Sequence, residues 1–338
     1  MFGFSGTSIA DPEVEQICEL FAANKIGGIV LFKHNVKSPS QVKQLIAAIK
    51  DKAPKAIIAV DQEGGKVQRF NQDNGFNSYH TAAHLGEVDF AVHIDQCKKM
   101  ATELAGLGVN LNFAPVVDIK DEVSSVICGY ERAYSDDPLV VTEYALELIK
   151  IHQQVGVKTC AKHFPGHGLA SGDTHHGLVD ISKTWQSDLE LLPYKLMCQQ
   201  GCLDSVMTAH LMHKTEFGKH PFSLATGMVT KHLRSQLGYS GMIITDDLCM
   251  KAIANNYSAN EAVPMALAAG NDMVIYSNNA NSSLLKSGNN IKKRNLIALA
   301  DGFIKAISDF VAKDKISKEQ LQKSIARVEQ FTEVDATV

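Results

Sequence analysis

The sequence predicts a closed (β/α)8 barrel, the TIM-type fold, for the whole chain. Short apolar runs alternate with longer amphipathic ones, which is typical of βα units and a parallel sheet. Eight such runs occur, and the 338 residues leave room for insertions beyond the ~250 that are typical of this barrel. An open, doubly wound sheet is the alternative arrangement of the same units.

Each predicted strand is an apolar run of three to five residues. The runs comprise residues 2–4, 28–32, 56–60, 109–113, 157–161, 205–208, 242–245 and 273–276. Helix start signals lie between them, in the form of capping-box pairs. These pairs are Ser38 with Gln41, Ser258 with Glu261, and Ser317 with Gln320. The last pair opens a predicted C-terminal helix with an apolar stripe of Leu321, Ile325 and Val328.

No shift in composition and no linker divides the chain, and no repeat of fixed period is present. We therefore expect residues 1–338 to form one barrel domain, with C-terminal helices from about residue 295 to about residue 332. The Asn/Ser-rich stretch 277–290 predicts a long loop after the last strand.

The composition excludes several classes of protein. The formal net charge of −4 gives no electrostatic footprint for nucleic acid or an acidic membrane. No segment approaches the ~20 apolar residues of a membrane helix, and residues 1–9 lack the basic and apolar regions of a secretory signal. Seven scattered cysteines favour reduced thiols over a disulfide framework. We expect a cytoplasmic enzyme that is monomeric and uses no cofactor.

Polar residues follow the predicted strands at the point where each strand ends. They are Asp61, Asp118, Lys162, His163, His210, Asp246 and Asp247. Barrels of this type place their active sites at the C-terminal ends of the strands. Packing does not explain charged groups at so many strand ends, so the sequence predicts one polar pocket there.

The most informative segment is KHFPGHG at residues 162–168, followed by Asp173, Thr174 and His175. A Gly-rich loop after a buried strand is able to move, and a carboxylate beside an imidazole makes a tunable proton donor. His175 is therefore the candidate proton donor, and Asp173 is expected to orient its ring and favour the charged form. The adjacent His176 is expected to be a surface residue.

Asp246 is the candidate for the second catalytic group. At the end of an apolar strand its carboxylate would lie at the barrel mouth, where it can attack the anomeric carbon of a sugar or stabilise a cation there. The alternative is a helix N-cap, because Asp246 and Asp247 separate a strand from a helix-like run. Both interpretations hold if one of the two aspartates is the helix cap and the other is the catalytic group.

A further set of residues is suited to holding a ligand rich in hydroxyls, which both donate and accept hydrogen bonds. This set consists of Asp61, Arg69, Arg132, Lys162 and His163. Arg69 lies in the segment 61–69, whose paired glycines permit a tight turn at the strand end.

Two rival motifs are weaker. His163 and His167 have a helical spacing for metal ligands, but Pro and Gly between them break any helix and no third ligand is obvious. Gly166, Gly168 and Gly172 do not have the spacing of a nucleotide-binding loop. We therefore expect no metal.

Together these motifs resemble family 3 glycoside hydrolases, specifically the single-domain bacterial β-N-acetylglucosaminidases of peptidoglycan recycling. The resemblance runs nearly from end to end. It is carried by residues 27–32, 61–69, 112–118, 131–135, 162–168, 173–175 and 245–248. The departures are modest: Thr174 stands where the family usually has Ser, Lys66 stands where it usually has Arg, and residues 169–172 differ in identity.

The resemblance implies specific roles. They are nucleophile for Asp246, general acid/base for His175, dyad partner for Asp173, and sugar binding for Asp61, Arg69, Arg132, Lys162 and His163. The implied reaction is a double displacement with retention that releases terminal β-linked N-acetylglucosamine from peptidoglycan fragments or related saccharides. Phosphorolysis stays open, since a neutral imidazole would not repel an anionic acceptor. The sequence also allows a β-glucosidase or xylosidase of the same family, or a sugar-binding barrel without catalysis.

Overall fold

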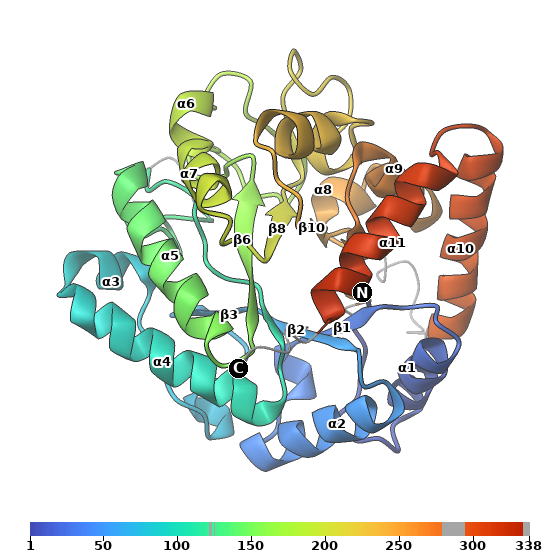
Figure 1. Ribbon diagram of the computed structural model, residues 1–338, viewed down its shortest axis with the longest axis horizontal. Coiled ribbons are helices and arrows are strands. Elements are labelled where there is room, and N and C mark those ends of the chain that lie inside the picture. The colour runs from blue at the N-terminus through green and yellow to red at the C-terminus, as the bar shows by residue number, and fades with distance from the viewer. Residues whose placement is uncertain (122–123, 125, 279–294, 334–338) are drawn as a thin grey trace.

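The computed structural model describes residues 1–121, 124, 126–278 and 295–333. Its centre is a parallel sheet that is curved into a barrel and surrounded by helices (Figure 1). The strands follow one another around the sheet in the order β1 (Gly28–Leu31), β2 (Ile57–Val60), β5 (Leu111–Asn112), β6 (Lys158–Phe164), β8 (Ser205–Thr208), β10 (Met242–Asp247) and β11 (Met273–Ile275). Phe2 bridges both Ile29 of β1 and Tyr276 beside β11, so it takes the eighth position between the two sheet edges. The predicted (β/α)8 barrel is confirmed, and the open sheet is wrong.

Helices connect successive strands and cover the outside of the barrel (Figure 1). They are α1 (Pro12–Ala22), α2 (Pro39–Lys52), α3 (Ala82–Glu87), α4 (Phe90–Leu107), α5 (Pro138–Gln153), α6 (Ser187–Glu190), α7 (Leu192–Gln200), α8 (Lys251–Ala254), α9 (Ala259–Ala269), α10 (Leu296–Ala312) and α11 (Lys318–Thr332). Short 3-10 turns occur at η1 (Lys33–Asn35), η2 (Gln72–Asn74) and η3 (Phe222–Leu224), and η4 (Thr230–Gln236) is a π-helix. Two small ladders complete the structure: β3 (Gln62–Gly64) pairs with β4 (Val67–Gln68), and β7 (Val179–Asp180) pairs with β9 (Leu211–Met212).

The strands are apolar on both faces because each face is covered. In β2, Ile57 and Ala59 belong to the cluster that fills the barrel interior, whereas Ile58 and Val60 pack against the surrounding helices. A parallel strand buried on both sides has this continuous apolar character. The apolar runs therefore correspond to the buried parts of the strands. The polar residues that follow these runs lie at the mouth of the barrel.

The predicted helix starts are present, although only one of the three predicted capping boxes is complete. Ser258 and Glu261 form both halves of the box at α9. The side chains of Ser38 and Ser317 accept hydrogen bonds from the amide three residues later, as predicted. The glutamine side chains at those two positions bond to other groups, so the reciprocal half is missing there.

The predicted apolar stripe on α11 is wrong in part, because Ile325 is 57% exposed. The helix instead turns Ser324 and Arg327 toward the buried carboxylate of Asp272, each at 2.8 Å. Phe331 packs into the cluster of the barrel interior. A buried carboxylate needs donors, and this requirement sets the rotation of the helix about its axis.

The predicted loop after the last strand and the absence of a membrane helix were also expected from the sequence. Most of the predicted loop 277–290 lies outside the described residues. Among the helices that are described, none combines the length and the apolar character needed to cross a bilayer.

Candidate active site

The carboxyl ends of the barrel strands surround one cavity of about 860 Å³. All the residues predicted to act in catalysis or sugar binding line this cavity except Asp173, which contacts His175. Asp118 and His210, which were also expected in the polar pocket, are not part of its lining. The predicted residues in its lining are Asp61, Arg69, Arg132, Lys162, His163, His175 and Asp246. Residues far apart in the sequence therefore meet at one end of the barrel.

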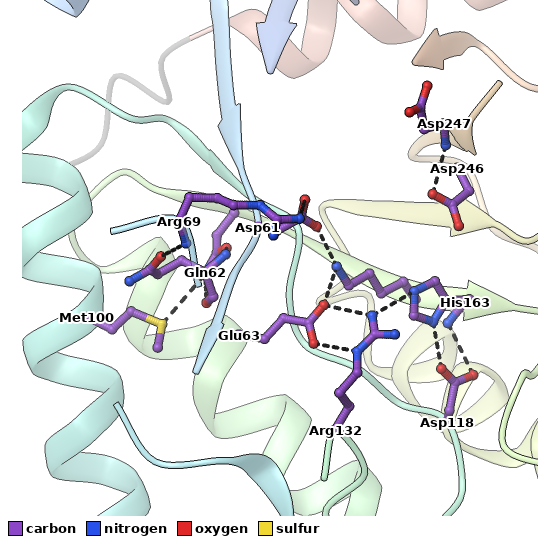
Figure 2. Close-up of polar contacts among 12 residues, drawn as sticks. Asp61, Gln62, Glu63, Arg69, Met100, Asp118, Arg132, His163, Asp246 and Asp247 are labelled. Atoms are coloured by element: carbon purple, nitrogen blue, oxygen red, sulfur yellow. Dashed lines mark hydrogen bonds and ion pairs between the residues drawn. The ribbon is translucent and has the colours of Figure 1, made fainter. Parts of the chain in front are cut away.

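A chain of ion pairs forms one wall of the cavity (Figure 2). The Nζ of Lys162, a residue only 2% exposed, lies 2.7 Å from Asp61 Oδ1 and 2.6 Å from Glu63 Oε1. Arg69 Nη2 lies 2.8 Å from the other oxygen of Asp61. Arg132 donates to both oxygens of Glu63, at 2.8 Å from Nε and 2.9 Å from Nη2. Each long cationic side chain is thereby held in one conformation.

These pairs keep both carboxylates ionised. Burial alone would raise the pKa of Asp61, but the positive charges of Lys162 and Arg69 outweigh burial and lower that pKa. Burial is likewise outweighed at Glu63, where Arg132 and then Lys162 lower the pKa to about 2. Burial would lower the pKa of Lys162, yet attraction to the two carboxylates raises it.

Glu63 is a residue that the sequence prediction missed. It is buried, and it joins Lys162 to Arg132 in the centre of the ion-pair chain. Glu63 lies in β3, two positions after Asp61, which directly precedes that strand. Alternate side chains of an extended segment lie on the same face. That spacing is the signal that could have grouped the two carboxylates.

His163 is held by hydrogen bonds on both ring nitrogens. Its Nδ1 lies 2.7 Å from Asp118 Oδ2, and its backbone amide donates to Asp118 Oδ1 at 3.2 Å. Arg132 Nη2 lies 3.1 Å from His163 Nε2. A guanidinium can only donate, so Nε2 accepts and the ring proton is assigned to Nδ1. His163 therefore links Arg132 to Asp118, the second residue that the predicted binding set omitted.

The two aspartates at the end of β10 have different surroundings. Asp247 Oδ1 accepts hydrogen bonds from the amides of Cys249 at 3.0 Å and Ser277 at 2.9 Å. The amide of Asp247 donates to Asp246 Oδ1 at 2.7 Å. Figure 2 shows the two carboxylates pointing in different directions. Neither aspartate is a helix cap, because the N-cap position of α8 is Met250. Asp247 is instead held by two backbone amides outside that helix, and the Asp246 carboxylate lines the cavity.

The pKa values of these two carboxylates move in opposite directions. Burial raises the pKa of Asp247. Burial would also raise the pKa of Asp246, but the neighbouring imidazoles, that of His210 foremost, lower it below its ordinary value. Asp246 is therefore the member of the pair whose environment favours the ionised form.

The expected contact between Asp173 and His175 is present. His175 Nδ1 lies 2.8 Å from Asp173 Oδ1, and the same oxygen accepts from the His175 amide at 2.8 Å. Since Nδ1 is engaged, Nε2 is the ring nitrogen that a ligand can reach, and the side chain is 59% exposed. His176 is 76% exposed, in agreement with the surface position expected for it.

The rival motifs find no support within the described part of the chain. No group of three or more His, Cys, Asp or Glu side chains is placed there to hold a metal ion. The amide of His167 donates to Asp118 at 2.8 Å, and that of Leu169 donates to Glu190 at 3.2 Å. These amides are therefore engaged and do not form a phosphate cradle.

Comparison with known proteins places the chain among glycoside hydrolases. The family model for the glycosyl hydrolase family 3 N-terminal domain matches residues 9–331. A beta-hexosaminidase of Nitrosomonas eutropha is 35% identical over 294 residues, which cover 84% of this chain and 81% of that protein. One of Tolumonas auensis is 35% identical over 281 residues, covering 78% of this chain and 81% of its own.

Solved structures give the same picture. A family 3 β-N-acetylglucosaminidase of Paenibacillus sp. matches with a TM-score of 0.84 at 29% identity, and the match covers 100% of this chain. This chain spans only 62% of the length of that Paenibacillus chain. A beta-N-acetylhexosaminidase of Beutenbergia cavernae matches with a TM-score of 0.81 at 25% identity, covering 99% of this chain and 96% of that one.

Proposed function

This chain belongs to glycosyl hydrolase family 3, and we propose that it is a retaining exo-β-N-acetylglucosaminidase. The substrate would be a small saccharide with a terminal β-linked N-acetylglucosamine, such as a peptidoglycan fragment. The names of the relatives and structural neighbours support this sugar. One observation carries the proposal: the carboxylate of Asp246 and the imidazole of His175 come from separate elements and line the same cavity.

Asp246 acts as the nucleophile in the first step. Its oxygen attacks the anomeric carbon and forms a glycosyl ester, while the bond from that carbon to the leaving oxygen breaks. His175 gives the proton on Nε2 to the departing oxygen, so the leaving group departs as a neutral alcohol. The lowered pKa of Asp246 supports this role, because the attacking carboxylate must be ionised.

The second step reverses the roles of the same groups. The neutral imidazole of His175 takes a proton from water, and the water oxygen attacks the anomeric carbon. The ester bond to Asp246 breaks, and the sugar leaves with its original anomeric configuration. Asp173 keeps the ring oriented throughout, since it holds Nδ1.

The ion-paired wall would bind the hydroxyl groups of the sugar. Asp61, Arg69, Lys162 and Arg132 offer fixed acceptors and donors, and each is restrained by its partner. A hydroxyl can both donate and accept, so it fits between such groups at little reorganisation cost. His163 adds an imidazole ring to the same wall.

The setting that we propose is the recycling of cell-wall saccharides in the cytoplasm by a monomeric enzyme. The formal net charge of −4 supports a partner that is neither nucleic acid nor an acidic membrane. No cofactor enters the mechanism, because the two displacements need only the side chains named above.

A panel of aryl β-glycosides, assayed with and without phosphate, tests the proposal. We expect an N-acetylglucosaminide to be cleaved in preference to a glucoside or a xyloside. A preference for the glucoside would point to another specificity within the family, and binding without turnover would point to a non-catalytic barrel. Release of a sugar 1-phosphate in the presence of phosphate would identify phosphorolysis.

A further inference from the structure

Buried carboxylates hold the base of the acid/base loop, which we define as residues 165–175. The amide of His167 donates to Asp118 Oδ1 at 2.8 Å, and the amide of Leu169 donates to Glu190 Oε1 at 3.2 Å. The amide of Gly168 also interacts with the Glu190 carboxylate. Asp118 already holds His163 in the cavity wall, whereas Glu190 has no place in the site described so far.

Glu190 ends α6 and is only 2% exposed. The loop packs directly on it: a Cβ added at Gly166, where φ is +125°, would lie 2.5 Å from Glu190 Cβ and 2.7 Å from its Oε1. Burial, with the negative charge of Asp118, raises the pKa of Glu190 to about 8. A carboxyl is costly to bury where an apolar side chain would fill the space. The hydrogen bonds that the Glu190 carboxyl group accepts from the loop explain why a carboxyl group occupies this buried position.

The far end of the acid/base loop is held as well. The carbonyl oxygen of Thr174 accepts from the amide of Ala252 at 3.1 Å, and Ala252 belongs to α8 just after β10. The hydroxyl oxygen of Thr174 lies 3.5 Å from His167 Nε2. Asp173 and His175 flank Thr174. The contact between Thr174 and His167 joins this end of the loop to its base, so a shift at the base would reach both catalytic residues.

We propose that Glu190 is a positioning residue for acid catalysis, which acts through the amides of residues 168 and 169 to set where the loop holds His175. This inference rests on the proposed function, because it takes His175 as the proton donor. Glu190 does not line the cavity, so its loss should spare the attack by Asp246. It should weaken protonation of the leaving oxygen, since a general acid must lie within hydrogen-bond reach.

The test compares two substrates on each enzyme preparation. One is a 2,4-dinitrophenyl N-acetyl-β-glucosaminide, whose leaving group needs no proton, and the other is a β-1,4-linked disaccharide of N-acetylglucosamine. The ratio of their kcat/KM values does not depend on the folded fraction. For E190A we expect the ratio to move against the disaccharide by about tenfold or more, because general acid catalysis contributes roughly 10²–10⁴-fold. E190Q keeps one acceptor oxygen and should lie between E190A and the wild type.

D204N is the matched control. Asp204 is a half-buried carboxylate at the opposite end of β6, where it accepts from the Thr159 amide at 2.9 Å and the Thr159 hydroxyl at 2.8 Å. Its substitution should lower stability and leave the substrate ratio unchanged. Equal losses on both substrates in the Glu190 variants, or the same ratio change in D204N, would overturn the inference. If E190A does not fold, E190Q decides, and an unchanged ratio counts against a positioning role.

The outcome also separates this inference from the proposed function. A wild type that cleaves neither N-acetylglucosaminide would contradict the proposed function itself. A wild type that depends on acid assistance, with Glu190 variants that keep the wild-type ratio, would remove only the role of Glu190.

Discussion

Removal of the Glu63 charge should destabilise the protein strongly at neutral pH. Glu63 is 7% exposed and lies between Arg132 and Lys162. Its pKa is lowered from 4.5 to about 2 although burial opposes this, and such a shift corresponds to about 3 kcal/mol of preference for the ionised form. E63Q should therefore lose about 3 kcal/mol of the free energy of unfolding at pH 7, within the ~3–5 kcal/mol typical of breaking a buried pair.

The pH dependence of the free energy of unfolding provides a second, independent test of the role of Glu63. Since the pKa of Glu63 is lower in the folded state, its contribution is complete above pH 4.5 and is lost as the pH falls toward about 2. E63Q cannot titrate at this position. The stability difference between the wild type and E63Q should therefore shrink as the pH falls below 4.5.

Urea denaturation at several pH values provides the measurement, and D95N provides the control. Asp95 pairs with Lys99 at 2.7 Å, but the two side chains are 63% and 64% exposed, so the loss should be no more than about 0.5 kcal/mol. The reasoning fails if E63Q is as stable as D95N at pH 7, or if its deficit grows as the pH falls.

Three further predictions concern the catalytic groups and the loop. A fluorinated N-acetylglucosaminyl donor that slows hydrolysis should trap a covalent adduct, which peptide mapping should place on Asp246; an adduct on Asp247 would refute the assignment. H175A should lose far more activity on poor leaving groups than on activated ones, and equal losses would exclude His175 as the acid. From pH 4.5 to about 8 the folded protein retains a proton on Glu190 that the unfolded chain releases, so stability falls as pH rises. E190Q should flatten that slope in thermal denaturation, and an unchanged slope would contradict the raised pKa.

Local patterns in the sequence predicted the barrel because the strands coincide with short apolar runs, and polar residues come at or soon after the ends of most of them. The same patterns placed Asp61, Lys162 and Asp246 at one end of the barrel. They could not reveal that Glu63 joins Lys162 to Arg132, because that role depends on partners about 70 and 100 residues away. Glu190 escaped for the same reason, since its partners are amide groups that every residue carries.

The helix α11 shows a second limit of local patterns. Its apolar residues predicted an inward face at Ile325, yet the buried carboxylate of Asp272 draws Ser324 and Arg327 inward and leaves Ile325 exposed. Periodicity describes how one helix would bury its own apolar surface. Periodicity does not take into account a buried polar group on a distant element that needs hydrogen-bond partners from the helix.

The charges around the cavity explain why Asp246 is suited to its proposed role. Asp61 and Glu63 are paired with Arg69, Lys162 and Arg132 in the wall, and Asp118 bonds to His163. Among the described residues, no Lys or Arg forms an ion pair with Asp246. Asp246 differs in this respect from Asp61 and Glu63, each of which is ion-paired with Lys or Arg. A positive charge that develops on the anomeric carbon would find its strongest fixed electrostatic partner at Asp246, in a site where few charges must reorganise.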